Sequence, residues 1–151
     1  MVLGHDSAAC VLYHKNKKSF LFVRQFRPAV FVAKIRSMPE NINKSLKEIN
    51  WTTYPINIGK TIELCAGIID KPNLDAKRHI HEEIIEECGY NVPIDSIKHI
   101  KKLIAGVGSS GSQQDIFFAE IDESMRVSDG GGIGEESIEK VFLCCEAFYF
   151  F

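Results

Sequence analysis

Residues 75–88 constrain this chain most, because they predict one amphipathic helix that is crowded with acids. Ile80, Ile84 and Cys88 recur every four residues and would form a buried stripe. Asp75 is a suitable N-cap, and Gly89 can end the helix in a left-handed conformation. A helix with one apolar stripe has to pack that stripe against another element.

This helix also carries four glutamates within two turns, at positions 82, 83, 86 and 87. Glu83 lies three and four residues before Glu86 and Glu87, so the three carboxylates share one face. Like charges at this spacing repel and destabilise a helix. A hard divalent cation such as Mg²⁺ or Mn²⁺ would offset that repulsion, because carboxylate oxygens are its preferred ligands. A solvated acidic face is the usual meaning of such a run, and the spacing alone leaves both interpretations open.

The rest of the chain predicts strands on both sides of this helix. Residues 8–13 and 20–26 read as a hairpin because a polar link joins two segments rich in β-branched and aromatic residues. Further strands are predicted at 61–66, 97–104, 116–121 and 138–143. Residues 33–60 read as a long polar loop. One strong helix among strands predicts a mixed sheet with the helix packed on it.

Composition limits the classes of partner. With 151 residues and 45% apolar content, the chain is sized for one compact domain, and its net charge of −2 calls for neither nucleic acid nor an anionic membrane. No apolar run approaches the roughly 20 residues that span a bilayer. The five cysteines lack a C-x-x-C pair, which favours reduced thiols and a cytoplasmic protein. Both ends look abrupt, so a longer version of the chain is expected.

The frame around the helix, "ELCAGIIDKPNLDAKRHIHEEIIEECGY" at 63–90, resembles the Nudix box, G-x5-E-x7-R-E-U-x-E-E-x-G-U, where U is apolar. Gly67 matches the first glycine, and the end of the pattern is matched in register by Glu83, Ile84, Glu86, Glu87, Gly89 and Tyr90. The spacing is one residue longer than the pattern. Glu82 occupies the place of an arginine that steadies the glutamates, and Lys77 or Arg78 are the candidates to replace it. Loss of that cation would raise the pKa of the carboxylates and weaken metal binding.

The resemblance extends to "HDSAACVLYHKNKKSFLFVRQFRPAV", "AGVGSSGSQQDIFFAEI" and "GGGIGEESIEKVFL", which look like the UDP-sugar pyrophosphatase branch of the Nudix hydrolases, where the longer spacing is usual. It implies an α/β fold, a Nudix-type α/β/α sandwich with a mixed sheet, as a single domain over residues 1–151. It also implies a homodimer and Mg²⁺-dependent hydrolysis of a nucleoside diphosphate sugar, with UDP-glucose giving UMP and glucose 1-phosphate. An ADP-ribose pyrophosphatase and a catalytically weak Nudix-like binding module remain the alternatives.

The resemblance also assigns roles around the metal. It makes Mg²⁺ ligands, with Mn²⁺ as the alternative ion, of Glu83, Glu86, Glu87 and the carbonyl of Ala66, and it makes Glu83 and Glu87 catalytic. The general base would be Glu136, with Glu135 as the fallback, on a glycine-rich loop that is free to close over the substrate. The alternative for that loop is an ordinary hairpin with solvated acids.

Substrate contacts are implied elsewhere. Arg24 and Arg27 would bind phosphate oxygens through their planar guanidinium groups, and Glu63 would contact a ribose or a phosphate-bound metal. Each of the three could equally be an ordinary strand residue. The loop with Gly67 would pass over the phosphates. The sugar side would be lined by Ser109, Ser110, Gln113 and Gln114. The segment "GVGSSGSQQ" lacks the lysine of a phosphate-binding P-loop and is not read as a nucleoside triphosphate site.

Overall fold

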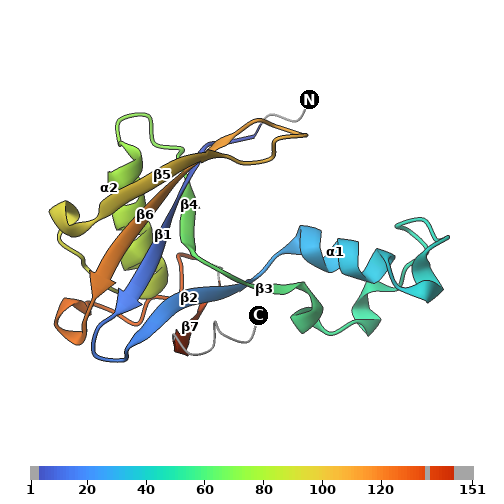
Figure 1. The fold of residues 1–151 in the computed structure, drawn as a ribbon. Coiled ribbons are helices and arrows are strands. Elements are labelled where there is room, and N and C mark those ends of the chain that lie inside the picture. Colours follow the sequence, from blue (N-terminus) through green and yellow to red (C-terminus); the bar gives the residue numbers. More distant parts are fainter. Residues whose placement is uncertain (1–3, 135–136, 145–151) are drawn as a thin grey trace.

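The computed structural model describes residues 4–134 and 137–144, and within them seven strands form one mixed sheet (Figure 1). The strands are β1 Ser7–His14, β2 Ser19–Phe26, β3 Lys60–Glu63, β4 Cys65–Ile68, β5 Lys98–Ile104, β6 Gln113–Ile121 and β7 Glu139–Cys144. The predicted hairpin is confirmed, since β1 and β2 pair antiparallel with Leu12 opposite Leu21. The three later strands are confirmed close to their predicted positions.

β1 is the centre of the sheet. It pairs antiparallel with β2 and β4 and parallel with β6, and β5 pairs antiparallel with the other side of β6. β3 and β7 both pair antiparallel with β2. The parallel β1–β6 pairing among antiparallel ones makes the sheet mixed, as predicted.

The prediction of one strand at 61–66 was wrong, because the chain changes partner there. β3 pairs with β2, placing Glu63 opposite Val23, whereas β4 pairs with β1, placing Ala66 opposite Ala9. The apolar run is divided into two strands of four residues because each half forms hydrogen bonds with a different neighbour. The switch brings Ala66 to the middle of the sheet, beside β1.

The predicted helix is confirmed, with a departure in its last turn. Helix α2 spans Ala76–Glu83, and the Asp75 side chain caps it by accepting a hydrogen bond from the Arg78 N–H at 2.8 Å. The chain then continues as a π-helix, Ile84–Cys88, which Gly89 ends with φ of +79°. π-helical turns are rare and widen the helix locally.

The apolar stripe of this helix forms the core, as its period predicted. Ile80, Ile84 and Cys88 are fully buried, and they belong to one cluster with Cys10 and Leu12 of β1. α2 packs on the face of the sheet that β1 and β4 provide (Figure 1). The mixed α/β class follows from this contact.

Residues 28–59 form an arm that projects from the sheet (Figure 1). The prediction of a long loop missed its helix, α1, which spans Pro28–Arg36 and begins with a proline suited to a first helical turn. The Arg27 N–H donates to the Gly59 carbonyl at 2.8 Å, so the arm starts and ends at one point. α1 packs mainly on the 3-10 turn Ile56–Gly59, which explains why a weakly periodic segment is helical here.

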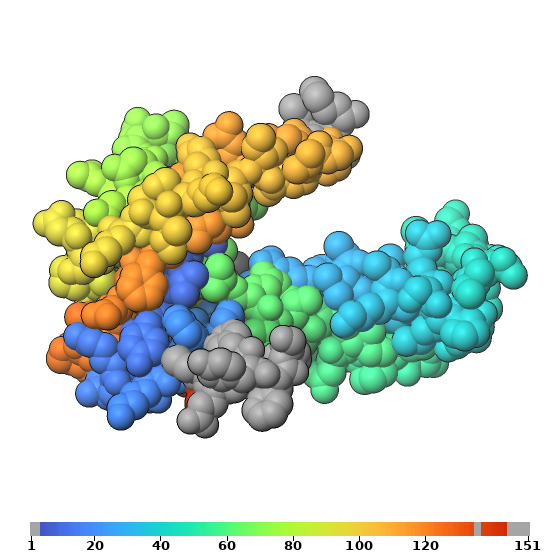
Figure 2. All heavy atoms as spheres, viewed as in Figure 1, coloured from blue at the N-terminus to red at the C-terminus, as the bar shows by residue number. Residues whose placement is uncertain are grey.

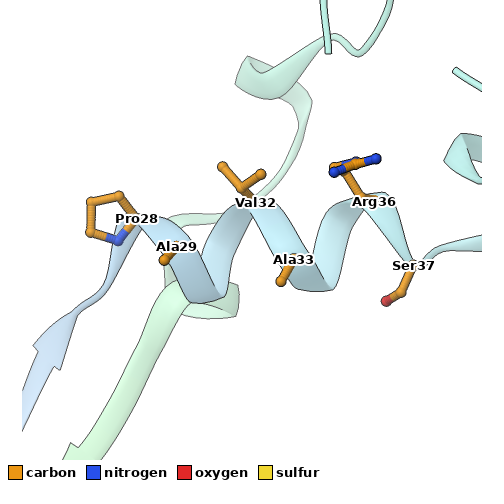
Figure 3. Close-up of a pocket in the computed structure, with 6 residues that line it drawn as sticks. All are labelled: Pro28, Ala29, Val32, Ala33, Arg36 and Ser37. Atoms are coloured by element: carbon orange, nitrogen blue, oxygen red, sulfur yellow. The ribbon is translucent and has the colours of Figure 1, made fainter. Parts of the chain in front are cut away.

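The surface is indented between the arm and the β5–β6 hairpin (Figure 2). A shallow hollow also lies on α1 alone, lined by Pro28, Ala29, Val32, Ala33, Arg36 and Ser37 (Figure 3). Its lining includes one cationic side chain, Arg36, and no carboxylate, so it lacks the metal-binding groups that the helix glutamates provide. None of the helices in the described residues has the length and apolar character that crossing a bilayer requires.

Replacing Gly89 with alanine is expected to destabilise the fold. Position 89 has a positive φ, and an added Cβ would overlap the backbone carbonyl of Ser128. The free energy of unfolding in urea should fall by about 1–3 kcal/mol. Gly108→Ala is the matched control, because Gly108 has open space around it and no positive φ, and it should unfold at the wild-type urea concentration or slightly above it. Equal midpoints for the two variants would contradict the capping role of Gly89.

Candidate active site

One pocket of about 560 Å³ collects most of the predicted site residues from separate parts of the chain. It lies where β2, β3 and β4 meet the α2 side of the sheet. The predicted residues that line it are Arg27, Glu63, Ala66, Gly67, Glu83, Glu86 and Glu87. Gln114, which was predicted for the sugar side, also lines it, as do residues that were not assigned to the site, namely Ser7, Gln25, Ile68, Asp70, Lys71, His79 and Ile133.

Gly67 leaves room for the Glu83 carboxylate against the sheet. It lies in β4 opposite Ala8, and a Cβ added to it would overlap the Glu83 carboxylate. The sequence placed this glycine in a loop over the phosphates, whereas the structure places it in a strand, under Glu83. Its lack of a side chain is what allows the Glu83 carboxylate to lie on the strand backbone.

Glu87 is held by the same strand. Its side chain is only 5% exposed, and its Oε2 accepts a hydrogen bond from the Ala66 N–H at 3.2 Å. A buried carboxylate is costly unless polar groups satisfy it, so this backbone donor partly explains its place. Glu87 belongs to the π-helix, and such turns are frequent at functional sites because they redirect side chains.

Three buried cysteines lie in the hydrophobic core that carries the glutamate helix. Cys10, Cys65 and Cys88 are fully buried and free, as the absence of a C-x-x-C pair predicted. Burial raises the pKa of Cys10 to about 12. A hydrogen bond with Cys88, together with burial, raises the pKa of Cys65. Cys10 and Cys65 therefore stay protonated at neutral pH and pack as small apolar groups.

The oxygen atoms of this pocket suit a hard cation. Glu83, Glu86 and Glu87 line it together with the backbone of Ala66. Among the residues that the structure describes, no three acidic, histidine or cysteine side chains already stand in metal-coordinating positions. Mg²⁺ usually takes only one or two protein carboxylates and completes its shell with waters and substrate phosphates, so the donor set fits that ion without a closed cage.

Arg27 and Glu63 pair with each other at the pocket edge. Arg27 Nε donates to Glu63 Oε1 at 2.9 Å, and its Nη2 donates to Oε2 at 2.7 Å. These bonds lower the pKa of Glu63, to which Thr61 also donates a hydrogen bond. The resemblance predicted a separate substrate contact for each of the two residues, whereas the structure joins them in one ion pair that lines the cavity.

Arg24 is separated from the glutamates. Because successive strand residues point to opposite faces, Arg24 faces away from Gln25, which lines the pocket. Arg24 Nε donates to Glu139 at 3.0 Å, in a different pocket that Lys60 also lines. The resemblance assigned Arg24 and Arg27 together to the substrate, but strand alternation turns Arg24 to the other face of the sheet.

Ser110 and Gln113 do not line the pocket, whereas the neighbouring Gln114 does. The N–H of Gln113 donates to Asp6 Oδ1 at 2.7 Å, and Gln114 Nε2 donates to Ser7 Oγ at 3.1 Å inside the pocket wall. Ser110 stays in the β5–β6 turn beside Ser112. The alternation of β6 could have distinguished Gln113 from Gln114, had the start of that strand been known.

The glycine-rich loop is bonded to the end of the glutamate helix. The Gly131 N–H donates to the Glu87 carbonyl at 2.9 Å, and the Gly132 N–H donates to the Glu86 carbonyl at 3.1 Å. Ile133 continues into the pocket wall. The proposed base Glu136 and its neighbour Glu135 lie outside the described residues. The described part of the loop is thus anchored directly beneath the carboxylates.

Comparisons with known proteins agree with this site. No family model matches the chain. It is 34% identical over 145 residues to the uridine diphosphate glucose pyrophosphatase of Bos taurus, covering 92% of this chain and 65% of that protein. It is 32% identical over 134 residues to the GDP-mannose pyrophosphatase of Cronobacter sakazakii, covering 89% of this chain and 57% of that protein.

A solved structure described as an ADP compounds hydrolase has the same fold, with a TM-score of 0.60 at 14% identity over 95% of this chain and 60% of that one. The chain therefore spans between half and two thirds of the curated relatives it matches. The resemblance seen in the Nudix box is confirmed over nine tenths of the sequence. This chain is a homologue of the Nudix pyrophosphatases.

Proposed function

We propose that the protein hydrolyses the diphosphate of a nucleoside diphosphate sugar with Mg²⁺, and that UDP-glucose, giving UMP and glucose 1-phosphate, is its substrate. The observation that carries the proposal is the convergence of Glu83, Glu86 and Glu87 with Gly67 and Ala66 in one pocket. Two curated relatives are named for UDP-glucose and GDP-mannose, which supports a sugar diphosphate as the substrate class.

Glu83, Glu86, Glu87 and the Ala66 carbonyl would hold the metal. Bound Mg²⁺, or Mn²⁺ in its place, would neutralise the diphosphate and make an attacking water more acidic. Glu87 keeps its orientation through the Ala66 N–H, and Glu83 through its place on Gly67. Fixed carboxylates of this kind hold charge where the reaction needs it without reorganising.

Arg27 and the polar wall complete the proposed site. The Arg27 guanidinium, oriented by Glu63, can donate to phosphate oxygens at the pocket edge. Ser7, Gln25 and Gln114 offer neutral donors and acceptors to the rest of the substrate. Glu136, or Glu135 in its place, would take a proton from the attacking water, because the loop that carries them is anchored beside Glu86 and Glu87.

We also propose that the chain acts as one Nudix domain in a cytoplasmic homodimer. The chain covers 65% and 57% of the two relatives, so the activity of those whole proteins is carried to this chain only as a proposal. Hydrolysis of ADP-ribose and a binding function without turnover are the rival activities. Assays with UDP-glucose, GDP-mannose and ADP-ribose distinguish sugar nucleotide hydrolysis, ADP-ribose hydrolysis and binding without turnover.

Removal of the glutamates tests the metal mechanism. Glu83→Gln or Glu87→Gln should lower the Mg²⁺-dependent release of UMP from UDP-glucose by about 10²-fold or more, the scale of losing one well-placed charge contact in the transition state. Chelation of Mg²⁺ should stop the wild-type reaction. Glu120→Gln, which removes an exposed acid outside the pocket, should be fully active.

Parallel assays with GDP-mannose and ADP-ribose rank the substrates by kcat/KM. A higher value for ADP-ribose than for either sugar nucleotide would replace the proposed substrate by its rival. Tight binding of UDP-glucose without product would favour the binding protein. Full activity of Glu87→Gln would disprove the role given to the helix.

Gly67→Ala should damage activity more than stability. The added methyl group would overlap the Glu83 carboxylate, which is the free end of a flexible side chain and can move aside. The fold should survive, with an unchanged urea midpoint, whereas displacement of Glu83 should lower kcat by about 10-fold to 10²-fold. Gly108→Ala is again the control, since open space surrounds it. Wild-type kcat in Gly67→Ala would show that the close approach of Glu83 to β4 has no catalytic importance.

A further inference from the structure

Glu82 stands where the Nudix pattern has an arginine, so α2 itself brings no cation to that place. The structure supplies one from the loop between β4 and α2, because Lys71 Nζ contacts the Glu82 carboxylate. Lys71 is among the residues that line the pocket, whereas Lys77 and Arg78, which the sequence favoured as replacements, are not. A lysine before the helix thus occupies the region of the missing arginine.

The backbone of Lys71 is held in place. His79 of α2, which is 3% exposed, donates from Nε2 to the Lys71 carbonyl at 3.2 Å. The Leu74 N–H donates to the same carbonyl at 3.1 Å. One carbonyl that receives two donors fixes the start of the side chain relative to α2, so Lys71 does not depend on Glu82 for its position in the loop.

The charge balance of the pocket indicates a role for Lys71 in substrate binding. The described residues that line the cavity include five acids, Glu63, Asp70, Glu83, Glu86 and Glu87, and their two permanent cations are Arg27 and Lys71. Arg27 is engaged by both oxygens of Glu63. Lys71 instead pairs with Glu82, which does not line the cavity. A diphosphate that enters among these acids needs protein cations to balance its charge in addition to a metal.

The ammonium group of Lys71 can serve both partners. Glu82, and more weakly Glu86 and Asp70, raise the pKa of Lys71, so it is charged at neutral pH. An ammonium has three donors, so one can remain with Glu82 while another binds a phosphate oxygen. The Lys71–Glu82 pair is exposed, and exposed ion pairs add little to the stability of a fold. Stabilisation of the fold therefore does not explain why Lys71 lies there.

We infer that Lys71 binds the diphosphate of the substrate and that Glu82 is a positioning residue that holds the ammonium group at the pocket rim. This inference rests on the proposed function, in which the pocket takes a nucleoside diphosphate. The departure from the Nudix pattern at position 82 is then part of the substrate site: the anion at 82 directs a cation that comes from position 71.

Direct binding of UDP in the presence of Mg²⁺, measured by calorimetry, tests the inference without requiring turnover. Lys71→Met should weaken UDP binding about tenfold or more, as expected for losing a charged hydrogen bond, and should raise the KM for UDP-glucose more than it lowers kcat. Lys71→Arg should keep most of the affinity. Lys77→Met, which removes a cation that does not line the cavity, should bind UDP like the wild type.

Glu82→Gln should weaken UDP binding less than Lys71→Met does, because the fixed backbone still presents the lysine. The exchange Lys71→Glu with Glu82→Lys should not restore binding, because the new cation starts from outside the cavity. Mg²⁺ affinity without nucleotide should not fall in Lys71→Met. A fall would show that Lys71 steadies the carboxylates, as the family's arginine does, and would overturn the inference.

The outcomes for the inference and for the proposed function can be told apart. An active wild type with unchanged UDP binding in Lys71→Met overturns the inference alone, as does restored binding in the exchanged pair. An inactive wild type that binds UDP, and loses that binding in Lys71→Met, overturns the proposed hydrolysis and supports the inference. A wild type that neither binds UDP nor hydrolyses UDP-glucose overturns both.

Discussion

The close approach of α2 to β4 is the contact on which the rest of the site depends. Ile80 and Ile84 bury one side of the helix against the sheet, and the glutamates are carried on the adjoining side. Gly67 leaves room for the Glu83 carboxylate on β4, because a side chain at position 67 would overlap it. The Ala66 N–H then satisfies Glu87. Apolar packing thus sets the positions of groups whose mutual repulsion would otherwise separate them.

Hydrogen-bond donors from several segments of the chain stabilise the clustered acids. A backbone N–H of β4 serves Glu87, Arg27 serves Glu63, and Lys71 serves Glu82. The buried thiols of Cys10 and Cys65 remain neutral and add no charge. The glycine-rich loop bonds to the carbonyls at the end of the helix, which links the path of that loop to the same element. Glu63, Glu82 and Glu87 are therefore each held by a part of the chain outside α2.

Several predictions followed from short-range rules and were confirmed. The N-cap at Asp75, the end at Gly89 and the buried stripe were readable because each depends on neighbours within a turn or two. The resemblance assigned Arg24, Ser110 and Gln113 to the site, but strand alternation turns Arg24 and Gln113 away from the pocket, and Ser110 stays in the β5–β6 turn. Lys77 and Arg78 were named as replacements for the missing arginine because they lie one turn before Glu82, whereas the cation that contacts Glu82 is Lys71, eleven residues before it. The π-helical last turn and α1 had no period from which they could be predicted.

The sequence by itself determined the mixed α/β class, the helix with three glutamates on one face and the relationship to Nudix enzymes, because these depend on local pattern and on residue spacing. The tertiary structure decided which other residues meet that helix. The division of residues 60–68 into two strands places Ala66 and Gly67 under the glutamates, and the path of the loop places Lys71 beside Glu82. Such contacts join residues distant along the chain, and hydrogen bonding and packing across the whole sheet fix them, which no local pattern records.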